Sequence, residues 1–344
     1  MKKFNNSDIY RDIAVSTRVR LARNLKDYPF PGKASKDQED AVINEVYTAL
    51  SSNAKQKKFE LTKMEGLSGI DAMSLSEKHM ISPEFARAKN RRALITSQDK
   101  SAAVMVNEED HIRLQVTGAG LCTEECLKEA QEIDGAIEKS VDYAFDENLG
   151  YLTRCPTNLG TGIRVSVMLH LPALTKSGDI RNVIAALGKV GLAVRGIYGE
   201  GSSAKGDLYQ ISNQLTLGAT EEEIASRVND AAVQIIEREK GLRAAVLQSG
   251  DRDVVTDRIW RSVGVLRSAR SISSDEAASR VSDLRLAVSA GMIKDITFDA
   301  IDEMTSKIEP ATIESAAGGE ISPSERDKKR AELLRSMTRG ISLD

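Results

Sequence analysis

Apolar and polar residues alternate in four short segments of this chain, as they do in β-strands that bury one face. In residues 13–21 the apolar side chains share one face, and Arg18 and Arg20 lie on the other. The three further segments are residues 112–116, 163–171 and 192–195, which contribute Arg113, Arg164 and Arg195 to their polar sides. If these strands share one sheet, one face is apolar and the other carries a cluster of guanidinium groups.

Such a cluster repels itself unless a strongly anionic group occupies it. Planar guanidinium groups donate paired hydrogen bonds that suit phosphate oxygens. The alternation therefore predicts a site for a polyanion, and a triphosphate fits it best.

A second periodicity, with apolar residues three or four positions apart, indicates amphipathic helices in residues 127–144, 180–187 and 224–236. These helices are expected to cover one side of the sheet. A polar stretch at residues 248–253 resembles a linker, and residues 254–307 show helical spacing alone. A charged helix is expected from Ser324 to about Met337. The pattern predicts a second, mainly helical domain.

Composition narrows the choice of function. The chain has 344 residues, 41% of them hydrophobic, and a formal net charge of -3, so the arginine cluster is a local feature. Only 4% of the residues are aromatic, which disfavours a nucleic-acid module. No apolar run is long enough for a membrane span and the first residues lack the apolar core of a signal peptide, so we expect a cytoplasmic protein.

Three cysteines and three histidines offer little metal chemistry. Cys122 and Cys126 lie four residues apart on an expected helix, without histidines at zinc-ligand spacing, and we expect buried or inert thiols there. Cys155 is either a thiol activated by nearby cations or a small packed residue. His79 either contacts a nucleotide or forms a structural hydrogen bond.

Acidic residues stand beside two of the arginine strands. Glu108, Glu109 and Asp110 form a turn that runs directly into the Arg113 strand. Charged turns commonly face water, but carboxylates at the edge of an anion site also suit magnesium held through water. Glu200 follows the Arg195 strand in a glycine-rich loop. Two acids beside a triphosphate suggest that a cationic acceptor, such as a guanidinium, binds between them.

The segment 155–162 contains Gly160 and Gly162, which could let backbone N–H groups approach phosphate. A short glycine-containing loop is weak evidence by itself. The chain has no Walker A sequence and lacks the motifs of ordinary protein kinases.

Taken together and in order, the motifs at residues 16–20, 107–113, 155–164 and 195–200 resemble those of the phosphagen kinases, the ATP:guanidino phosphotransferases, and in particular their bacterial protein-arginine kinases. The resemblance covers about residues 8–240 as a catalytic domain, with 254–344 as a helical domain for dimerisation and phosphoarginine binding. It implies an α+β fold with a mostly antiparallel, glutamine-synthetase-like sheet flanked by helices. It also implies transfer of the ATP γ-phosphoryl group to arginine side chains of proteins, with Mg²⁺ as the metal.

The resemblance also implies roles for individual residues. Glu109 would be the base, Glu200 would orient the acceptor, and Cys155 would lie near the acceptor nitrogen. Glu108 and Asp110, together with Glu200, would organise magnesium through water. The residues implied to bind ATP are Ser16, Thr17, Arg18, Val19, Arg20, His79, Arg113, Arg164, Val165, Ser166, Val167, Met168, Arg195, Gly196, Ile197, Tyr198, Gly199 and Glu200.

Near the end of the chain, residues 326–331 are similar to an element with which protein-arginine kinases bind phosphoarginine for allosteric control. The implied ligand-binding residues are Arg326, Asp327, Arg330 and Ala331. The resemblance further implies a homodimer, a McsA-type activator, and a role in stress response and protein quality control, in which phosphoarginine marks proteins for the Clp protease system.

Three alternatives remain open from the sequence. The first is a phosphagen kinase that acts on free arginine or another small guanidine. The second is a phosphoarginine-binding adaptor without kinase activity, which the presence of both Glu109 and Glu200 disfavours. The third is a nucleic-acid module. Arg154, directly before Cys155, stands where relatives are expected to carry a small residue, and it leaves the local contacts of the thiol undecided.

Overall fold

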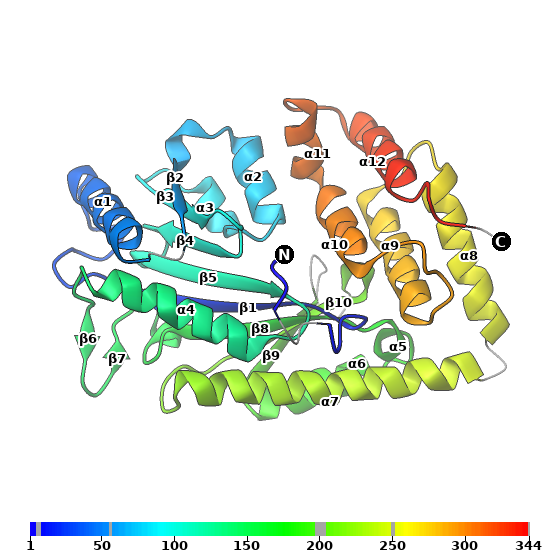
Figure 1. Cartoon of the computed structure of the whole chain (residues 1–344), viewed down its shortest axis with the longest axis horizontal. Helices are drawn as coiled ribbons and strands as arrows, with labels where there is room; N and C mark the ends of the chain where they lie inside the picture. Colours follow the sequence, from blue (N-terminus) through cyan, green and yellow to red (C-terminus); the bar gives the residue numbers. More distant parts are fainter. Residues whose placement is uncertain (5–7, 55–56, 197–203, 249–251, 343–344) are drawn as a thin grey trace.

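The computed structural model describes residues 1–4, 8–54, 57–196, 204–248 and 252–342. Its centre is an eight-stranded antiparallel sheet with the strand order β2-β3-β4-β5-β1-β8-β10-β9 (Figure 1). The strands are β1 (Ala14–Arg23), β2 (Phe59–Lys63), β3 (Ala93–Ser97), β4 (Ala102–Val106), β5 (Ile112–Ala119), β8 (Ile163–His170), β9 (Leu192–Gly196) and β10 (Leu208–Asn213). A separate hairpin pairs β6 (Phe145–Asp146) with β7 (Gly150–Tyr151).

Six helices lie between strands in the sequence, and six more follow the last strand in the described part of the chain. Those between the strands are α1 (Lys36–Asn53), α2 (Gly69–Glu77), α3 (Pro83–Arg87), α4 (Thr123–Glu138), α5 (Pro172–Lys176) and α6 (Ile180–Lys189). The later ones are α7 (Glu221–Gln248), α8 (Arg252–Ser268), α9 (Ser274–Ser289), α10 (Phe298–Lys307), α11 (Pro310–Ala317) and α12 (Pro323–Met337). Short 3-10 turns lie at η1 (Met64–Gly66), η2 (Pro156–Asn158) and η3 (Lys205–Asp207).

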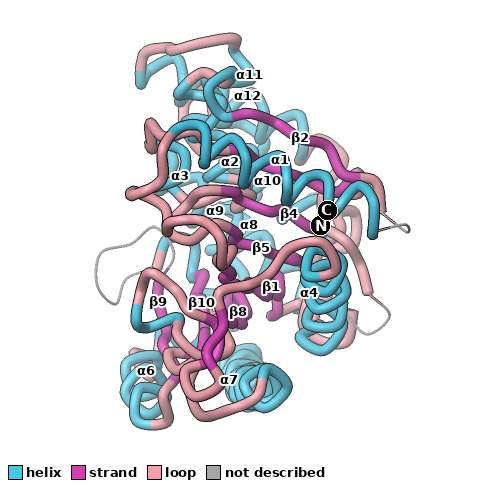
Figure 2. The backbone as a smooth tube through the Cα atoms, turned by 90° about the vertical axis from the view of Figure 1, so that its left-hand side faces the viewer, coloured by secondary structure: helices cyan, strands magenta, loops and turns pink. Residues whose placement is uncertain are grey.

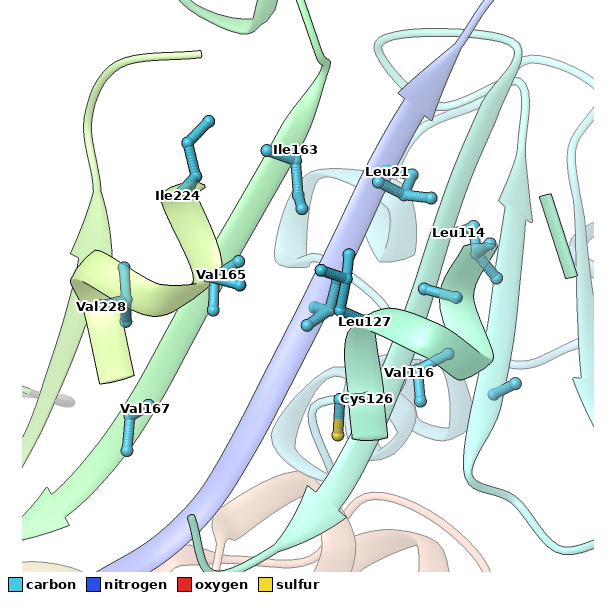
Figure 3. Packing of buried hydrophobic residues seen from close by; sticks show 14 of the residues in the cluster. Leu21, Leu114, Val116, Cys126, Leu127, Ile163, Val165, Val167, Ile224 and Val228 are labelled. Atoms are coloured by element: carbon cyan, nitrogen blue, oxygen red, sulfur yellow. The ribbon is translucent and has the colours of Figure 1, made fainter. Parts of the chain in front are cut away.

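One face of the sheet packs against α4 and α7 (Figure 3). The apolar sides of β1, β5 and β8 meet Leu127 of α4 and Val228 of α7, and all of these side chains belong to one buried cluster. Cys122 and Cys126 lie in the same cluster at 2% and 0% exposure, so the expectation of buried thiols is confirmed. Burial of this apolar layer is the main term that stabilises the sheet region.

The alternation in β1 is interrupted once. The register with β8 shifts between Ala14 and Ser16, so Ala14 takes the position opposite Leu169 that strict alternation assigns to Val15. Such a bulge adds one residue to one strand. Beyond it, Arg18 and Arg20 keep the face that the sequence predicts.

The helices from α8 to α12 enclose a second apolar cluster drawn from residues 255–341. Polar contacts join them to the sheet region: Arg285 of α9 donates to the carbonyl of Arg11 at 2.7 Å, and Ser289 donates to Asp12 at 3.1 Å. Figures 1 and 2 show these helices beside α2 and the sheet. Within the described part of the chain, no helix combines the length and apolar character that a membrane crossing requires.

Candidate functional site

The strand register brings the predicted arginines onto one face of the sheet. Arg20 of β1 lies opposite Arg164 of β8 on one side and Gln115 of β5 on the other. Arg18 lies opposite Ser166, and Arg113 lies on β5 opposite Ala22. Gln210 of β10 lies opposite Met168 of β8 on one side and Arg195 of β9 on the other, and Met168 lies opposite Ser16 of β1. Arg195 therefore belongs to the same face. The predicted shared sheet is therefore confirmed, and we call this surface the arginine face.

The arginine face is electrostatically strained in the way the sequence suggests. Burial, followed by the charges of neighbouring arginines, lowers the pKa of the Arg20 guanidinium well below its ordinary value. Those neighbours are Arg18, Arg113 and Arg164. Among the described residues, the Nε atoms of Arg20 and Arg164 are buried without a hydrogen-bond partner. Oxygen atoms of an anion would satisfy these donors and offset the repulsion.

The acidic turn stands at the edge of this face. Glu108 pairs with Arg113 at 2.7 Å and also accepts hydrogen bonds from the Ser82 hydroxyl and the Glu109 backbone N–H. Burial alone would raise the pKa of Glu108, but these partners outweigh it and the pKa is lowered. Asp110 is only 2% exposed, and its Oδ1 accepts from Asn24 and from the backbone N–H of Arg154.

Glu109 differs from its two neighbours because its side chain is exposed. Partial burial raises the pKa of Glu109, and the negative charges of Asp110 and Glu108 raise it further. A carboxylate with a raised pKa holds a proton more strongly. This is the direction that suits a general base.

His79 reaches the arginine face from the end of α2. It adopts a left-handed backbone with φ of +57°, and its carbonyl accepts a hydrogen bond from Gln115 at 2.9 Å. Burial, and then the charge of Arg18, lowers the pKa of His79 from 6.5 to about 4. The imidazole is therefore neutral at neutral pH, which allows it to lie beside cationic groups.

The lowered pKa of His79 has a measurable effect on stability. Between pH 4 and 6.5 the unfolded chain binds a proton at His79 and the folded chain does not, so acidification through this window destabilises the wild type. We expect the wild type to lose free energy of unfolding relative to His79→Asn as the pH falls from 6.5 to about 4. Urea unfolding of both proteins measures this difference. Parallel pH profiles would contradict the assignment.

Cys155 precedes η2, and its Sγ lies 3.0 Å from the Thr157 hydroxyl. Arg154 is exposed, lies beside Gly32, and contributes a positive charge at Glu109. The backbone N–H of Arg154 donates to Asp110 at 2.8 Å, so this residue connects the segment of the thiol to the acidic turn.

The surroundings of Gly160 and Gly162 give a packing reason for glycine at both positions. A Cβ on Gly160 would lie 2.5 Å from the carbonyl oxygen of Thr216, and one on Gly162 would lie 2.6 Å from that of Ala22. Both residues have positive φ values, of 104° and 63°. These glycines allow close packing of the protein on itself.

Several residues expected to bind ATP point away from the arginine face. Thr17 is opposite Val167, and Val19 is opposite Val165, on the face that α4 and α7 cover. All four have 0% exposure, and the Thr17 hydroxyl donates to the carbonyl of Gly120. Strand parity excludes their side chains from the site. Ser166, Met168 and Gly196 remain on the strands that form it.

The expected residues Ile197, Tyr198, Gly199 and Glu200 lie outside the described residues. Gln115, by contrast, is part of the site although the sequence reasoning did not select it. It is 4% exposed and donates to the carbonyls of both His79 and Met80. Its parity with Arg113 in the same strand was the available signal.

The residues expected to bind phosphoarginine lie on α12. Arg326 pairs with Glu314 of α11 at 2.8 Å, and Asp327 pairs with Arg330. Arg330 is 2% exposed and donates to the carbonyls of Ile308 and Ile272, while Ala331 is part of the second apolar cluster. Arg330 and Ala331 are thus buried by these contacts, and the structure does not present them on the surface.

The described residues contain no group of three or more histidine, cysteine or acidic side chains arranged to hold a metal. Glu108 already accepts hydrogen bonds at both oxygens. These side chains fit an ion that a nucleotide carries in with part of its water, which is the usual mode for magnesium. Among the described residues, they do not form a complete set of protein ligands for a magnesium ion.

Comparisons with known proteins agree with this geometry. The family model of the ATP:guanido phosphotransferase C-terminal catalytic domain matches residues 41–242, and that of the protein-arginine kinase McsB C-terminal domain matches residues 252–342. The protein-arginine kinase of Brevibacillus brevis is 44% identical over 332 residues, which cover 96% of this chain and 93% of that protein. The protein-arginine kinase of Halothermothrix orenii is 44% identical over 326 residues, covering 95% and 93%.

Solved structures show the same fold at lower identity. The crystal structure of lombricine kinase matches with a TM-score of 0.59 and 24% identity, covering 71% of this chain and 69% of that one. The duplicated taurocyamine kinase from Schistosoma mansoni, with bound transition state analog components, matches with a TM-score of 0.63 and 23% identity, covering 80% of this chain and 40% of that one. With its antiparallel sheet, its arginine face and these relatives, the chain belongs to the ATP:guanido phosphotransferases and, within them, to the protein-arginine kinases.

Proposed function

We propose that this enzyme transfers the γ-phosphoryl group of ATP to the guanidinium group of arginine residues in proteins. The observation that carries the proposal is the arginine face, on which Arg20 and Arg164 lie directly opposite each other with buried donors that lack partners in the described structure. A ligand with several anionic oxygens would satisfy these donors and offset the repulsion between the guanidinium groups. The relatives' activity on protein arginine supplies the acceptor.

In this proposal the arginines hold the phosphates and stabilise the charge that moves with the transferred phosphoryl group. The acceptor guanidinium has a pKa above about 12 and is a poor nucleophile until it loses a proton. Glu109, whose pKa is raised and whose side chain is exposed, is the proposed base. The proton passes to its carboxylate as the N–P bond forms and the bond between the γ-phosphorus and ADP breaks.

Other residues position the reactants. We propose that Cys155 lies near the acceptor nitrogen without forming a covalent intermediate, and that Glu200, outside the described residues, orients the acceptor. Magnesium bound with the nucleotide would neutralise phosphate charge, with Glu108 and Asp110 contacting its water shell. His79 and the β8 residues Arg164, Ser166 and Met168 would contact the nucleotide.

A direct assay tests the reaction. The purified protein is incubated with ATP and magnesium and given either a mixed protein pool or free arginine. We expect acid-labile phosphate on protein arginines, identified by mass spectrometry under neutral conditions, and much slower transfer to free arginine. Preferential phosphorylation of the free amino acid would replace the proposal by a small-guanidine kinase. Absence of both products would end it.

We further propose that residues 8–240 form the catalytic unit, and that residues 254–344 mediate homodimerisation and bind phosphoarginine for allosteric control. Arg326 and Asp327 are the partly buried residues of α12 that a ligand could reach. We also propose a cytoplasmic role in stress response and protein quality control, as the resemblance to protein-arginine kinases implies. In that role a McsA-type activator would stimulate the enzyme and phosphoarginine would mark proteins for the Clp protease system.

A further inference from the structure

Helix α11 begins between two segments that flank the arginine face. One is the end of α2, which carries His79, and the other is η3, which leads into β10. Figure 1 shows α11 next to α2, and the two helices are in contact. The start of α11 is hydrogen-bonded to both of these segments.

Glu77, the last residue of α2, connects α2 to the first turn of α11. Its carboxylate accepts hydrogen bonds from the backbone N–H of Ala311 at 2.9 Å and from that of Thr312 at 2.7 Å, and the Thr312 hydroxyl donates to it at 2.9 Å. The first N–H groups of a helix have no partner within the helix, and negative charge at this end is favourable. Glu77 thus caps α11 from another part of the chain.

The segment directly after Glu77 is hydrogen-bonded to the arginine face. His79 follows two residues later, and the carbonyls of His79 and Met80 both accept hydrogen bonds from Gln115 at 2.9 Å. Gln115 lies opposite Arg20 in the sheet. A shift of α2 relative to α11 would therefore move His79 against the arginine face.

Lys205, in η3, connects that segment to the start of α11. Its ammonium group lies 3.2 Å from Glu309, the residue that precedes α11, and both side chains are about one-tenth exposed, at 12% and 9%. Gly206 approaches α9 so closely that a Cβ would lie 3.1 Å from the carbonyl oxygen of Ala278. Leu208 then begins β10, in which Gln210 lies opposite Arg195. The salt bridge between Lys205 and Glu309 thus holds the start of β10, the strand that pairs with the Arg195 strand of the arginine face.

We propose that the first turn of α11 is a brace that holds both sides of the nucleotide site at a fixed separation, with Glu77, Lys205 and Glu309 as positioning residues. This inference rests on the proposed function, because the site that is held is the ATP site. None of these residues touches the reacting atoms in the proposal. They act through His79 on one side and through β10 on the other.

The brace also offers a route for regulation. Arg330 of α12 donates to the carbonyl of Ile308 at 2.8 Å, directly before Glu309, and Arg326 pairs with Glu314 within α11. A ligand that draws Arg326 away from Glu314 changes the support of α11. Its effect then reaches both sides of the ATP site together.

The test uses Glu77→Gln and Lys205→Met in the full-length protein. Glutamine keeps the shape of Glu77 but replaces one acceptor oxygen by a donor, and methionine removes the charge of Lys205. We expect the KM for ATP to rise about tenfold in each variant with a smaller change in kcat, within the usual range of coupling between sites. Hydrogen–deuterium exchange should also quicken on the far side: residues 204–208 in Glu77→Gln and residues 78–81 in Lys205→Met.

Matched controls come from the exposed ion pair of Lys100 and Glu60, the latter on edge strand β2, whose charged atoms lie 3.3 Å apart and which has no hydrogen bond or ion pair with α11 in the described structure. Glu60→Gln and Lys100→Met make the same chemical changes and should leave KM and exchange as in the wild type. Thr312→Val, which removes a single hydroxyl, should change KM in the same direction by less, and it serves if Glu77→Gln does not fold.

Two results would overturn the brace: unchanged exchange on the far side in folded variants, or a loss of kcat with an unchanged KM for ATP. Failure of the proposed function gives a different result, because the wild type itself would then yield no phosphoarginine. The exchange measurement needs no turnover, so it still decides whether α11 links the two sides.

Discussion

Arg20→Met should lower kcat/KM for ATP by about 10²- to 10³-fold, the usual range for loss of one charge-stabilising donor at a transition state. Arg20 is the central member of the arginine face, since it lies between Arg164 and Gln115 and feels the charges of three other arginines. Steady-state kinetics with ATP and a protein substrate measure the loss. The affinity for ATP should fall as well, because in the proposed mechanism the removed donor would contact phosphate in both the ground state and the transition state.

The same substitution should raise the thermal stability of the protein without nucleotide. Burial and like charges lower the pKa of Arg20, which means that the folded protein opposes its positive charge. Methionine removes that unfavourable charge at similar volume. Arg261→Met is the matched control, since Arg261 is exposed on α8 and pairs with Asp257. A stable but inactive Arg20→Met protein is the expected outcome; a less stable protein would show that Arg20 has a structural role instead.

Glu109→Gln should reduce kcat by about 10²- to 10⁴-fold, which is the range for removing a general base. The amide cannot accept the proton of the acceptor guanidinium, but it keeps the size of the side chain. Because Glu109 is exposed and no ion pair joins it to the arginines in the described structure, the dissociation constant for ATP should stay close to that of the wild type.

Calorimetry of ATP binding and single-turnover phosphorylation separate these two effects. Glu108→Gln is an informative comparison, because Glu108 pairs with Arg113 and its loss should disturb nucleotide binding as well as turnover. Equal turnover in Glu109→Gln and the wild type would remove Glu109 from the role of base. Glu200 would then be the remaining acid to test.

Much of the arginine face was predictable from the sequence because the relevant signal is local. In a strand, each side chain points opposite to its neighbours, so Arg18, Arg20 and Arg164 could each be placed on the polar side from adjacent residues alone. The same rule would have placed Thr17, Val19, Val165 and Val167 on the apolar side. The expectation that they bind ATP came from the motif as a block, and strand parity corrects it for their side chains.

Other features had no local signal. Arg330 occurs in a charged helical sequence that resembles an exposed ligand site, yet it is buried, because the carbonyls of Ile308 and Ile272 are brought to it by other helices. The close approach of Gly160 to Thr216 and of Gly162 to Ala22 likewise could not be read from the local sequence. In each case the partner lies far away in the chain, and only the packed structure identifies it.

By itself, the sequence determined which face each strand presents, which chemistry its motifs support, and to which family they belong, because parity and motif order are properties of the chain. The tertiary structure alone decided that Arg20 stands directly opposite Arg164, that Gln115 holds His79 beside them, and that α11 joins both sides of the site. Strand register and helix docking depend on burial and hydrogen bonding between distant segments, and these contacts form only when the whole chain packs.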